Sequence, residues 1–264
     1  MSELASEPLT QGRVGRRGVL VTGASGGIGR AVAVAFAAAG DRVAVHYSAR
    51  RAEAERTRAD LPGDGHALVS GDLADPLAVA DLAAAADTAL GGVDVLVNNA
   101  AVVTTGYAVP DADYGTWQRA WRETMAVNLL GAANLSYCVA RRLIDRGVGG
   151  WIVNVGSRGA FRGEPDAPAY GASKAGLHAF GQSLAVSLAP NGISVTSVAP
   201  GFVETDRVAD QLAGDSGAVI RAQSPYGRVA TPEEVAAAVV YLASPQARWS
   251  TGAVLDVNGA SHLR

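Results

Sequence analysis

Two kinds of segment alternate along the chain. Seven short runs rich in β-branched and aliphatic residues recur at positions 18–23, 42–47, 66–72, 93–99, 151–157, 193–201 and 253–259. Longer segments rich in alanine and leucine, with apolar residues at helical spacing, lie between most of them. Strands that alternate with helices predict a parallel sheet. Because helices cover both faces of such a sheet, its strands should be apolar throughout.

This order of elements predicts an α/β fold with one domain: a Rossmann-like, doubly wound parallel sheet of about seven strands with helices on both faces. No repeat, no proline- or serine-rich linker and no shift in composition divides the chain. We place the domain at residues 17–264. Residues 1–16 carry charges at both ends and no apolar stretch of signal-peptide length, so we expect a flexible arm there.

Composition narrows the range of functions. The net charge of −3 excludes the strongly basic surface that nucleic-acid binding requires. No apolar run reaches the length of about eighteen residues that a membrane-spanning helix needs, so we expect a cytoplasmic protein with no membrane partner. The single cysteine excludes an intrachain disulfide and a cysteine zinc cluster, and the four histidines show no ligand spacing. No metal is therefore expected.

A glycine-rich stretch, "VTGASGGIGRA" at 21–31, follows the first predicted strand and opens the first predicted helix. A helix N-terminus presents free backbone N–H groups and a positive dipole end, and glycines allow a ligand to approach the backbone. The pattern predicts a pyrophosphate site formed by Gly23, Ser25, Gly27, Ile28 and Gly29. The alternative is that the glycines only allow the strand and the helix to pack closely.

Two further strand ends suggest a nucleotide. Asp72 and Leu73 end the third run, where the carboxylate can accept a hydrogen bond from adenine and the leucine can pack on its ring. The stretch "NNAA" ends the fourth run, and we place Asn99 and Ala100 in the same cofactor site because the ends of parallel strands share one edge. Each feature has a structural alternative. Asp72 can serve as a turn residue, and the asparagines can join neighbouring strand ends.

Candidate chemistry comes from Tyr170 and Lys174, which are four residues apart and so share one face of a helix. Ser157 ends the fifth run. A phenol has a pKa of about 10, and lowering it to 7 needs roughly 4 kcal/mol of preferential stabilisation of the phenolate. An ammonium supplies that attraction, so we expect Lys174 to lower the pKa of Tyr170. A solvated helix face is the alternative for this spacing taken alone.

Together these motifs and "PGFVET" at 200–205 resemble the classical short-chain dehydrogenase/reductase family over residues 17–260, with the 3-oxoacyl-carrier-protein reductases as the nearest type. The resemblance implies hydride transfer between a nicotinamide cofactor and a carbonyl or secondary alcohol, with no metal. By position, Tyr170 is the proton donor or acceptor, Ser157 binds the substrate oxygen and Lys174 binds the nicotinamide ribose. The resemblance also assigns Pro200, Gly201, Val203 and Thr205 to the cofactor site.

Asn128, in "AVNLLG", matches the asparagine with which the family holds a water in a proton relay. The alternative is a polar residue at a kink in a buried helix. The chain departs from the family at Ala101, where a glycine is usual, and at Asn191, where carrier-protein reductases place an arginine that docks the acidic partner. The second departure argues against an acyl carrier. Another basic surface remains possible at Arg141, Arg142 and Arg146.

The end of the second run predicts the cofactor. Family members that prefer NAD(H) carry there an acidic residue that binds the adenine ribose and repels a 2′-phosphate. Tyr47 occupies this position, Ser48 can donate to a phosphate, and Arg50 or Arg51 can supply a cation. We therefore expect NADP(H) in preference to NAD(H). The alternative is that both arginines face solvent at the start of the next helix.

The sequence thus predicts an NADP(H)-dependent oxidoreductase that interconverts a carbonyl and a secondary alcohol on a small molecule. A catalytically silent dinucleotide sensor or scaffold is the alternative, but it leaves the joint presence of Asn128, Ser157, Tyr170 and Lys174 unexplained. The segments after Ser157 and at 202–226 should border the substrate, the second as a lid. Small residues along 172–189, together with the helix near 126–146, predict a homotetramer.

Overall fold

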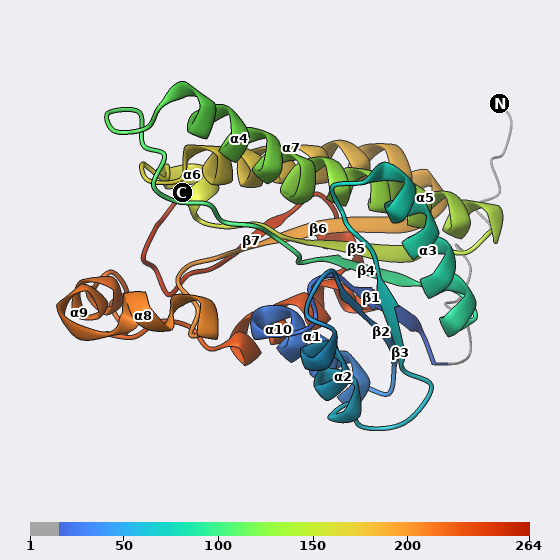
Figure 1. The fold of residues 1–264 in the computed structure, drawn as a ribbon. Coiled ribbons are helices and arrows are strands. Elements are labelled where there is room, and N and C mark those ends of the chain that lie inside the picture. The colour runs from blue at the N-terminus through green and yellow to red at the C-terminus, as the bar shows by residue number, and fades with distance from the viewer. Residues whose placement is uncertain (1–15) are drawn as a thin grey trace, which may run out of the picture.

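The computed structural model describes residues 16–264 as a seven-stranded parallel sheet covered by helices (Figure 1). The strand order is β3-β2-β1-β4-β5-β6-β7. The chain starts in the middle of the sheet, builds outward to β3, then crosses to β4 and builds outward to β7. The doubly wound fold is confirmed, and the strands are β1 (Gly18–Val21), β2 (Arg42–Tyr47), β3 (Ala67–Ser70), β4 (Val95–Asn98), β5 (Gly150–Val155), β6 (Ile193–Pro200) and β7 (Val254–Val257).

Helices form a layer on each side of the sheet (Figure 1). One layer contains α1 (Gly27–Ala38), α2 (Arg51–Ala59) and α10 (Pro232–Leu242), and α1 packs along α10. The other contains α3 (Pro76–Leu90), α4 (Tyr114–Met125), α5 (Ala132–Asp145) and α7 (Pro168–Leu188). Shorter elements are the π-helix η1 (Ala126–Gly131), α6 (Gly159–Arg162), η2 (Ala189–Asn191), η3 (Asp206–Val208), α8 (Ala209–Leu212), α9 (Gly214–Ala222) and η4 (Pro245–Ser250).

Burial follows the position of each strand in the sheet. Every residue of β1, β4, β5 and β6 is buried, as expected for strands covered on both faces. The strand β7 departs from this expectation, because Leu255 and Asp256 are exposed. It is the last strand of the sheet in the described residues and pairs only with β6. Among residues 16–264, no helix combines the length and the apolar character needed to cross a bilayer.

The first described residue, Arg16, is fastened to the fold. Its Nε donates to the carbonyl of Gly40 at 2.9 Å, and its Nη2 donates to the carbonyl of Asp64 at 2.7 Å. The rest of the arm that the sequence predicts, residues 1–15, lies outside the described residues.

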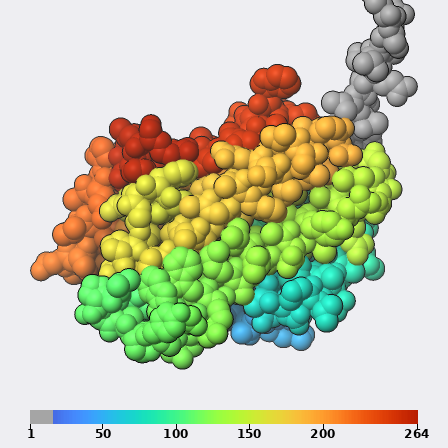
Figure 2. All heavy atoms as spheres, turned by 90° about the horizontal axis from the view of Figure 1, so that it is seen from above, coloured from blue at the N-terminus to red at the C-terminus, as the bar shows by residue number. Residues whose placement is uncertain are grey.

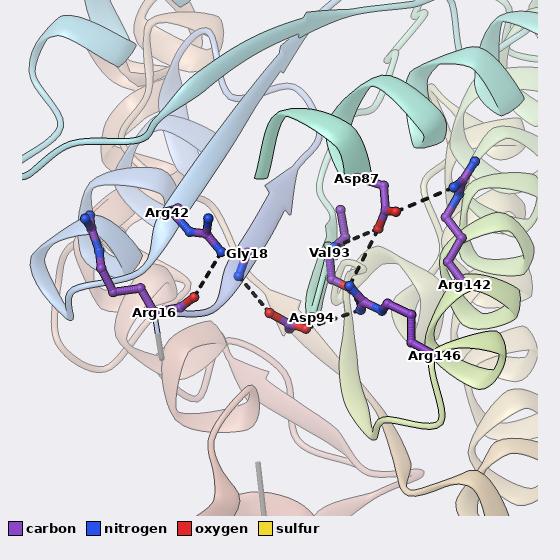
Figure 3. Close-up of polar contacts among 8 residues, drawn as sticks. All are labelled: Arg16, Gly18, Arg42, Asp87, Val93, Asp94, Arg142 and Arg146. Atoms are coloured by element: carbon purple, nitrogen blue, oxygen red, sulfur yellow. Dashed lines mark hydrogen bonds and ion pairs between the residues drawn. The ribbon is translucent and has the colours of Figure 1, made fainter. Parts of the chain in front are cut away.

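Ion pairs join the elements at the amino edge of the sheet (Figure 3). The buried carboxylate of Asp94, next to β4, accepts from the backbone N–H of Gly18 at 2.9 Å and from Nη2 of Arg146 at 3.2 Å. Asp87 of α3 lies 3.8 Å from Arg146 and 3.5 Å from Arg142 of α5. This network ties β1, β4, α3 and α5 together at the edge of the sheet opposite the candidate site.

We predict that Asp94→Ala lowers the free energy of unfolding by about 2 to 4 kcal/mol, because it leaves a strand N–H and a partly buried guanidinium without their acceptor. Urea denaturation measures the loss. The control is Asp64→Ala, which removes the Arg16 partner at a carboxylate that is 88% exposed and should cost less than about 1 kcal/mol. Equal losses in the two variants would contradict the role given to Asp94.

Candidate active site

The chain leaves β1 and β4 in opposite directions, which is the point where doubly wound sheets bind ligands, and we refer to the space between these strand ends as the crevice. The hydroxyl of Thr22, after β1, accepts from the backbone N–H groups of Asn99 and Ala100 at 2.9 and 3.0 Å. The Asn99 side chain donates in return to the carbonyl of Thr22 at 2.8 Å. Asn98 donates to Ser136 and Asn154, both at 2.9 Å. The side-chain amides of both asparagines thus connect neighbouring segments at the strand ends. This is the structural role that the sequence offered as the alternative to cofactor binding.

Close packing explains two of the glycines. A Cβ atom at Gly29 would lie 2.4 Å from the carbonyl oxygen of Gly23 and 2.5 Å from Nδ2 of Asn99. Gly23 has a φ of +64°, in the left-handed region that glycine adopts without strain. Gly27 also has a positive φ, +52°, and a Cβ there would meet the methyl group of Thr205 at 3.2 Å, on the other wall of the crevice.

The N-terminus of α1 has the features of an anion site. The helix begins at Gly27 with no side-chain cap and no acidic residue in its first turn. The backbone N–H groups of the first helical turn therefore have no acceptor within residues 16–264. They belong to Gly27, Ile28 and Gly29. These free donors and the helix dipole form an anion site, with Ser25 in the turn before it. The geometry is thus compatible with the predicted pyrophosphate site, which stays a prediction.

His46 was missed in the sequence, where histidines were considered only as metal ligands. Its Nδ1 accepts from the N–H of Gly23 at 3.1 Å, and its Nε2 lies 3.1 Å from the carbonyl of Gly71. Because Nδ1 accepts, Nε2 carries the proton and donates, and burial lowers the pKa of this neutral imidazole. The ring joins the glycine turn to the turn after β3. The available signal was a polar residue inside an apolar strand.

The adenine side of the site shows the structural alternative for Asp72. Its Oδ1 accepts from the N–H of Ala74 at 2.9 Å, as in an Asx turn, which leaves Oδ2 free within the described residues. Leu73 is buried in the apolar cluster of α3 and α5 rather than projecting from it. The two residues lie at the edge of the crevice, as predicted, but their contacts are those of a turn and of the core.

The two arginines after β2 differ in direction. Arg51 is paired with Glu55, with 2.8 Å between Nε and Oε1. The guanidinium of Arg50 lies beside the glycine turn, because a Cβ atom placed on Gly26 would be 3.7 and 3.8 Å from its two terminal nitrogens. Tyr47 is half-buried against the core, and Ser48 is exposed. Arg50 is thus the arginine that faces the predicted phosphate site.

The catalytic candidates meet at the carboxyl end of β5. Helix α7 places Tyr170 and Lys174 on one face, with Nζ of Lys174 5.8 Å from the centre of the tyrosine ring. The ammonium is buried and donates to the carbonyl of Val155 at 2.7 Å. The Ser157 side chain acts on the Tyr170 phenol and lowers its pKa, and the N–H of Gly159 donates to the Ser157 hydroxyl at 3.0 Å.

Electrostatics at this group differ from the expectation. Loss of water raises the pKa of Tyr170, and the charge of Glu164 adds to the rise, whereas Ser157 and Arg207 lower it. Lys174 is not among the groups that act on the phenol, so the expected lowering is not found. The reason is that burial brings the pKa of Lys174 itself to about 7. Much of the ammonium charge is therefore absent at neutral pH.

Asn128 lies in the π-helix η1 and is fully buried. Its side chain accepts from the N–H of Val102 at 2.8 Å and donates to the carbonyl of Val102 at 2.9 Å and to Ser173 at 3.2 Å. This geometry suits the alternative of a polar residue at an irregular turn of a buried helix, where it fastens the loop after β4. A part in a proton relay stays a prediction.

The segment after β6 forms the second wall of the crevice. Gly201 donates to the carbonyl of Val257, Val203 pairs with Ala230, and Thr205 faces the glycine turn. Beyond it, α8 and α9 project from the body of the molecule (Figure 1). Arg207 reaches back across the crevice and donates from Nη2 to the carbonyl of Ala101 at 3.2 Å. Pro200 to Thr205 therefore lie opposite the "NNAA" turn.

A doubly wound sheet with an uncapped glycine turn and a serine, a tyrosine and a lysine at one strand end defines a class: oxidoreductases that use a dinucleotide. The family profile described as enoyl-(acyl carrier protein) reductase matches residues 23–262. The chain belongs to the short-chain dehydrogenase/reductase family.

Relatives cover nearly the whole chain. L-Rhamnose 1-dehydrogenase (NAD(P)(+)) of Sphingomonas sp. (strain SKA58) is 37% identical over 93% of this chain and 96% of its own length. The 3-oxoacyl-[acyl-carrier-protein] reductase of Vibrio cholerae is 35% identical over 92% and 96%. A crystal structure of 3-ketoacyl-(acyl-carrier-protein) reductase from Brucella melitensis, complexed with NADH, superposes with a TM-score of 0.83 and 30% identity, covering 94% of this chain and 98% of that one.

The protein is therefore an enzyme of the oxidoreductase class, which interconverts carbonyl and hydroxyl groups with a nicotinamide dinucleotide. These relatives do not favour the alternative of a silent sensor or scaffold.

We predict that Tyr170→Phe lowers the rate of carbonyl reduction by about two to four orders of magnitude, because it removes the group that supplies the proton. Affinity for the reduced dinucleotide should stay near that of the wild type, since the ring remains. Consumption of reduced cofactor with the best carbonyl of a screen, and a fluorescence titration of the cofactor, measure the two effects. Near wild-type turnover in the variant would remove Tyr170 from its role.

We also predict that Lys174→Met stabilises the protein at pH 6 by about 1 to 3 kcal/mol, less so at pH 9.5. The pKa of Lys174 is about 7 in the folded state and 10.5 without the fold, so between these values the unfolded chain binds more protons. Wild-type stability therefore rises with pH in this window, and the variant lacks that rise. Urea denaturation at both pH values decides the point. A variant that is less stable than the wild type at pH 6 would contradict the buried-lysine assignment.

Proposed function

We propose that the enzyme is an NADP(H)-dependent carbonyl reductase or alcohol dehydrogenase that acts on a free small molecule in the cytoplasm. The observation that carries the proposal is the meeting of Ser157, Tyr170 and Lys174 beside the uncapped glycine turn. The test is a screen of ketones, aldehydes and secondary alcohols, sugars included, against both cofactors. A purified protein that binds a dinucleotide but converts no compound of the screen would favour the silent alternative.

The residues divide the work as follows. The nicotinamide, when bound, supplies or accepts the hydride. Ser157 and Tyr170 present two hydroxyl groups to the substrate oxygen, and Tyr170 gives its proton to that oxygen in reduction. The raised pKa of Tyr170 keeps the phenol protonated at neutral pH, which suits the proton donor. Oxidation needs the deprotonated form and is favoured by higher pH.

Other groups hold the cofactor. The N–H groups at the start of α1 would bind the pyrophosphate. Lys174 would hold the ribose of the nicotinamide, and the segment from Pro200 to Thr205 would cover the ring. Asn99 and Ala100 would contribute through the position of their backbone, because the Asn99 amide already binds Thr22 and Gly23.

The preference for NADP(H) rests on the end of β2. No acidic side chain stands at Tyr47 or Ser48, so nothing there repels a 2′-phosphate. The guanidinium of Arg50 has no hydrogen bond or ion pair within residues 16–264, and it borders the glycine turn. A cation with free donors at this position suits a phosphate.

We predict that Arg50→Gln weakens NADPH binding by roughly tenfold to a hundredfold and changes NADH binding little, because only the 2′-phosphate loses its partner. Dissociation constants for both reduced cofactors at two salt concentrations measure this, and the NADPH advantage should shrink as salt screens the contact. Arg51→Gln is the matched control, since that arginine is paired with Glu55. Tighter NADH than NADPH binding by the wild type at low salt would overturn the preference.

Delivery of the substrate by an acyl carrier is disfavoured. The alternative basic surface is neutralised, because Arg141 is paired with Asp145, Arg142 with Asp87, and Arg146 with Asp94. Asn191, in place of a docking arginine, lies in η2. An acidic carrier therefore finds little net positive charge on these residues, and we propose a substrate that diffuses freely.

We further propose a homotetramer assembled through α5 and α7. These helices lie side by side on one face (Figure 2). Among their residues, Tyr137 of α5 and Val186 of α7 are 68% and 80% exposed. Light scattering at micromolar concentration should give four times the mass of one chain, and Val186→Glu should shift it toward smaller species, because burying a charge in a packed interface is unfavourable. A monomer mass for the wild type would exclude the assembly.

A further inference from the structure

Arg158, the residue after Ser157, is a buried cation without a carboxylate partner. Only 5% of it is exposed, and it forms no ion pair within residues 16–264. Two of its five N–H groups donate to neutral oxygens, the hydroxyl of Ser261 and the side-chain amide of Gln223. Its guanidinium lies over the ring of Phe202, with Cζ 5.2 Å from the ring centre. Buried charges are normally paired, so this environment lacks an anion.

The guanidinium lines a cavity of about 350 Å³ at the carboxyl edge of the sheet. Its walls come from the lid segment, the start of α10 and the residues that follow β7, and it includes Phe202, Ser224, Asn258 and Ser261. Tyr170, Lys174 and Asn128 are not part of its lining. Ser157 does not line it either, so the link between the cavity and the catalytic group is Arg158, which follows Ser157 in the chain.

The ion pairs around the cavity leave one charged side chain of its lining without a partner. Two carboxylates line it, but Glu234 is held by Arg228 at 2.6 Å, and Asp256 is held by Arg264 at 2.9 Å. Only Arg158 has no such partner. Two further groups act on it from beyond ion-pair distance, Arg162 and Glu164, and their charges are opposite.

We propose that this cavity binds a carboxylate group of the substrate, with Arg158 as its ion-pair partner. The proposal rests on the proposed function, because it places the reacting carbonyl at Ser157 and Tyr170 and the carboxylate beyond them. The substrate class is then a keto acid, or the corresponding hydroxy acid. Arg158 would determine specificity and would not take part in the proton transfer.

A carboxylate suits the cavity better than a phosphate. One guanidinium balances one negative charge, and its planar fork can donate two parallel hydrogen bonds to a carboxylate. The Ser261 hydroxyl accepts from Arg158 and has no acceptor for its own proton within residues 16–264, so it can donate to the same anion. A doubly charged phosphate would need a second free cation, and the other cation of the lining, Arg228, is already paired with Glu234.

Matched pairs of substrates test the proposal. The wild-type enzyme is assayed with NADPH and with pyruvate, acetoacetate, 4-oxopentanoate and 5-oxohexanoate, each against its methyl ester. Because Arg158 stands at a fixed distance from Ser157, kcat/KM should favour the acid by tenfold or more at one chain length. Equal or better conversion of the ester at every length overturns the proposal.

Two variants locate the effect. Arg158→Met should raise KM for the preferred acid and bring the ratio of acid to ester close to one, because the lost contact is remote from the reacting carbonyl. Arg162→Met is the control: that arginine is exposed, donates to the same Gln223 oxygen at 3.2 Å and does not line the cavity, so it should keep the preference for the acid. An unchanged ratio in Arg158→Met removes the assignment.

A binding measurement separates this proposal from the proposed function. Pentanoate has the carboxylate but no carbonyl, and it should raise the melting temperature of the wild type, whereas pentanol should not. Arg158→Met, folded by circular dichroism, should lose the response. If no carbonyl is reduced, the proposed function fails, and pentanoate binding still decides the subsite. Without a pentanoate shift in the wild type, the subsite is rejected even if ketones are reduced.

Discussion

The site depends on the close approach of two turns at the centre of the sheet. The Thr22 hydroxyl binds the backbone after β4, Asn99 binds the backbone after β1, and Gly29 leaves no room for even a methyl group between them. Because the two halves of the fold diverge at this point, this contact decides where the crevice opens and where α1 begins. His46 extends the contact to the turn after β3. The anion site, the strand ends and the second wall all take their positions from it.

A second theme is that the site holds polar groups in states that would be unfavourable elsewhere in the protein. The first turn of α1 has no cap, Lys174 is buried with a pKa near 7, and Arg158 is buried without a carboxylate. At the opposite edge of the sheet, by contrast, the buried Asp94 is paired with Arg146. These three groups lie where ligands are expected, as is common for perturbed or unpaired groups of functional sites.

Local patterns were sufficient to predict the architecture. Continuous apolar runs predicted all seven strands, and the spacing of Tyr170 and Lys174 predicted their common helix face. What the sequence could not show depends on contacts between distant segments. The bond from Gly23 to His46, the two partners of Arg158 and the direction of the Tyr170 pKa all depend on residues far apart in the chain. For Asn99 and Asp72 the sequence allowed either a cofactor contact or a structural role. The contacts of the structure show the structural role for both side chains.

The hydrogen bond from Arg207 to the carbonyl of Ala101 bears on how ligands enter. It spans the space between the first residues of the lid and the turn after β4, so this side of the crevice is closed as long as the bond is made. A single exposed hydrogen bond contributes about 1 kcal/mol, which favours the bridged arrangement over the open one by only about fivefold. The open form is thus populated before any ligand arrives. The bridge is therefore a weak contact that favours the closed arrangement on this side of the crevice without fixing it.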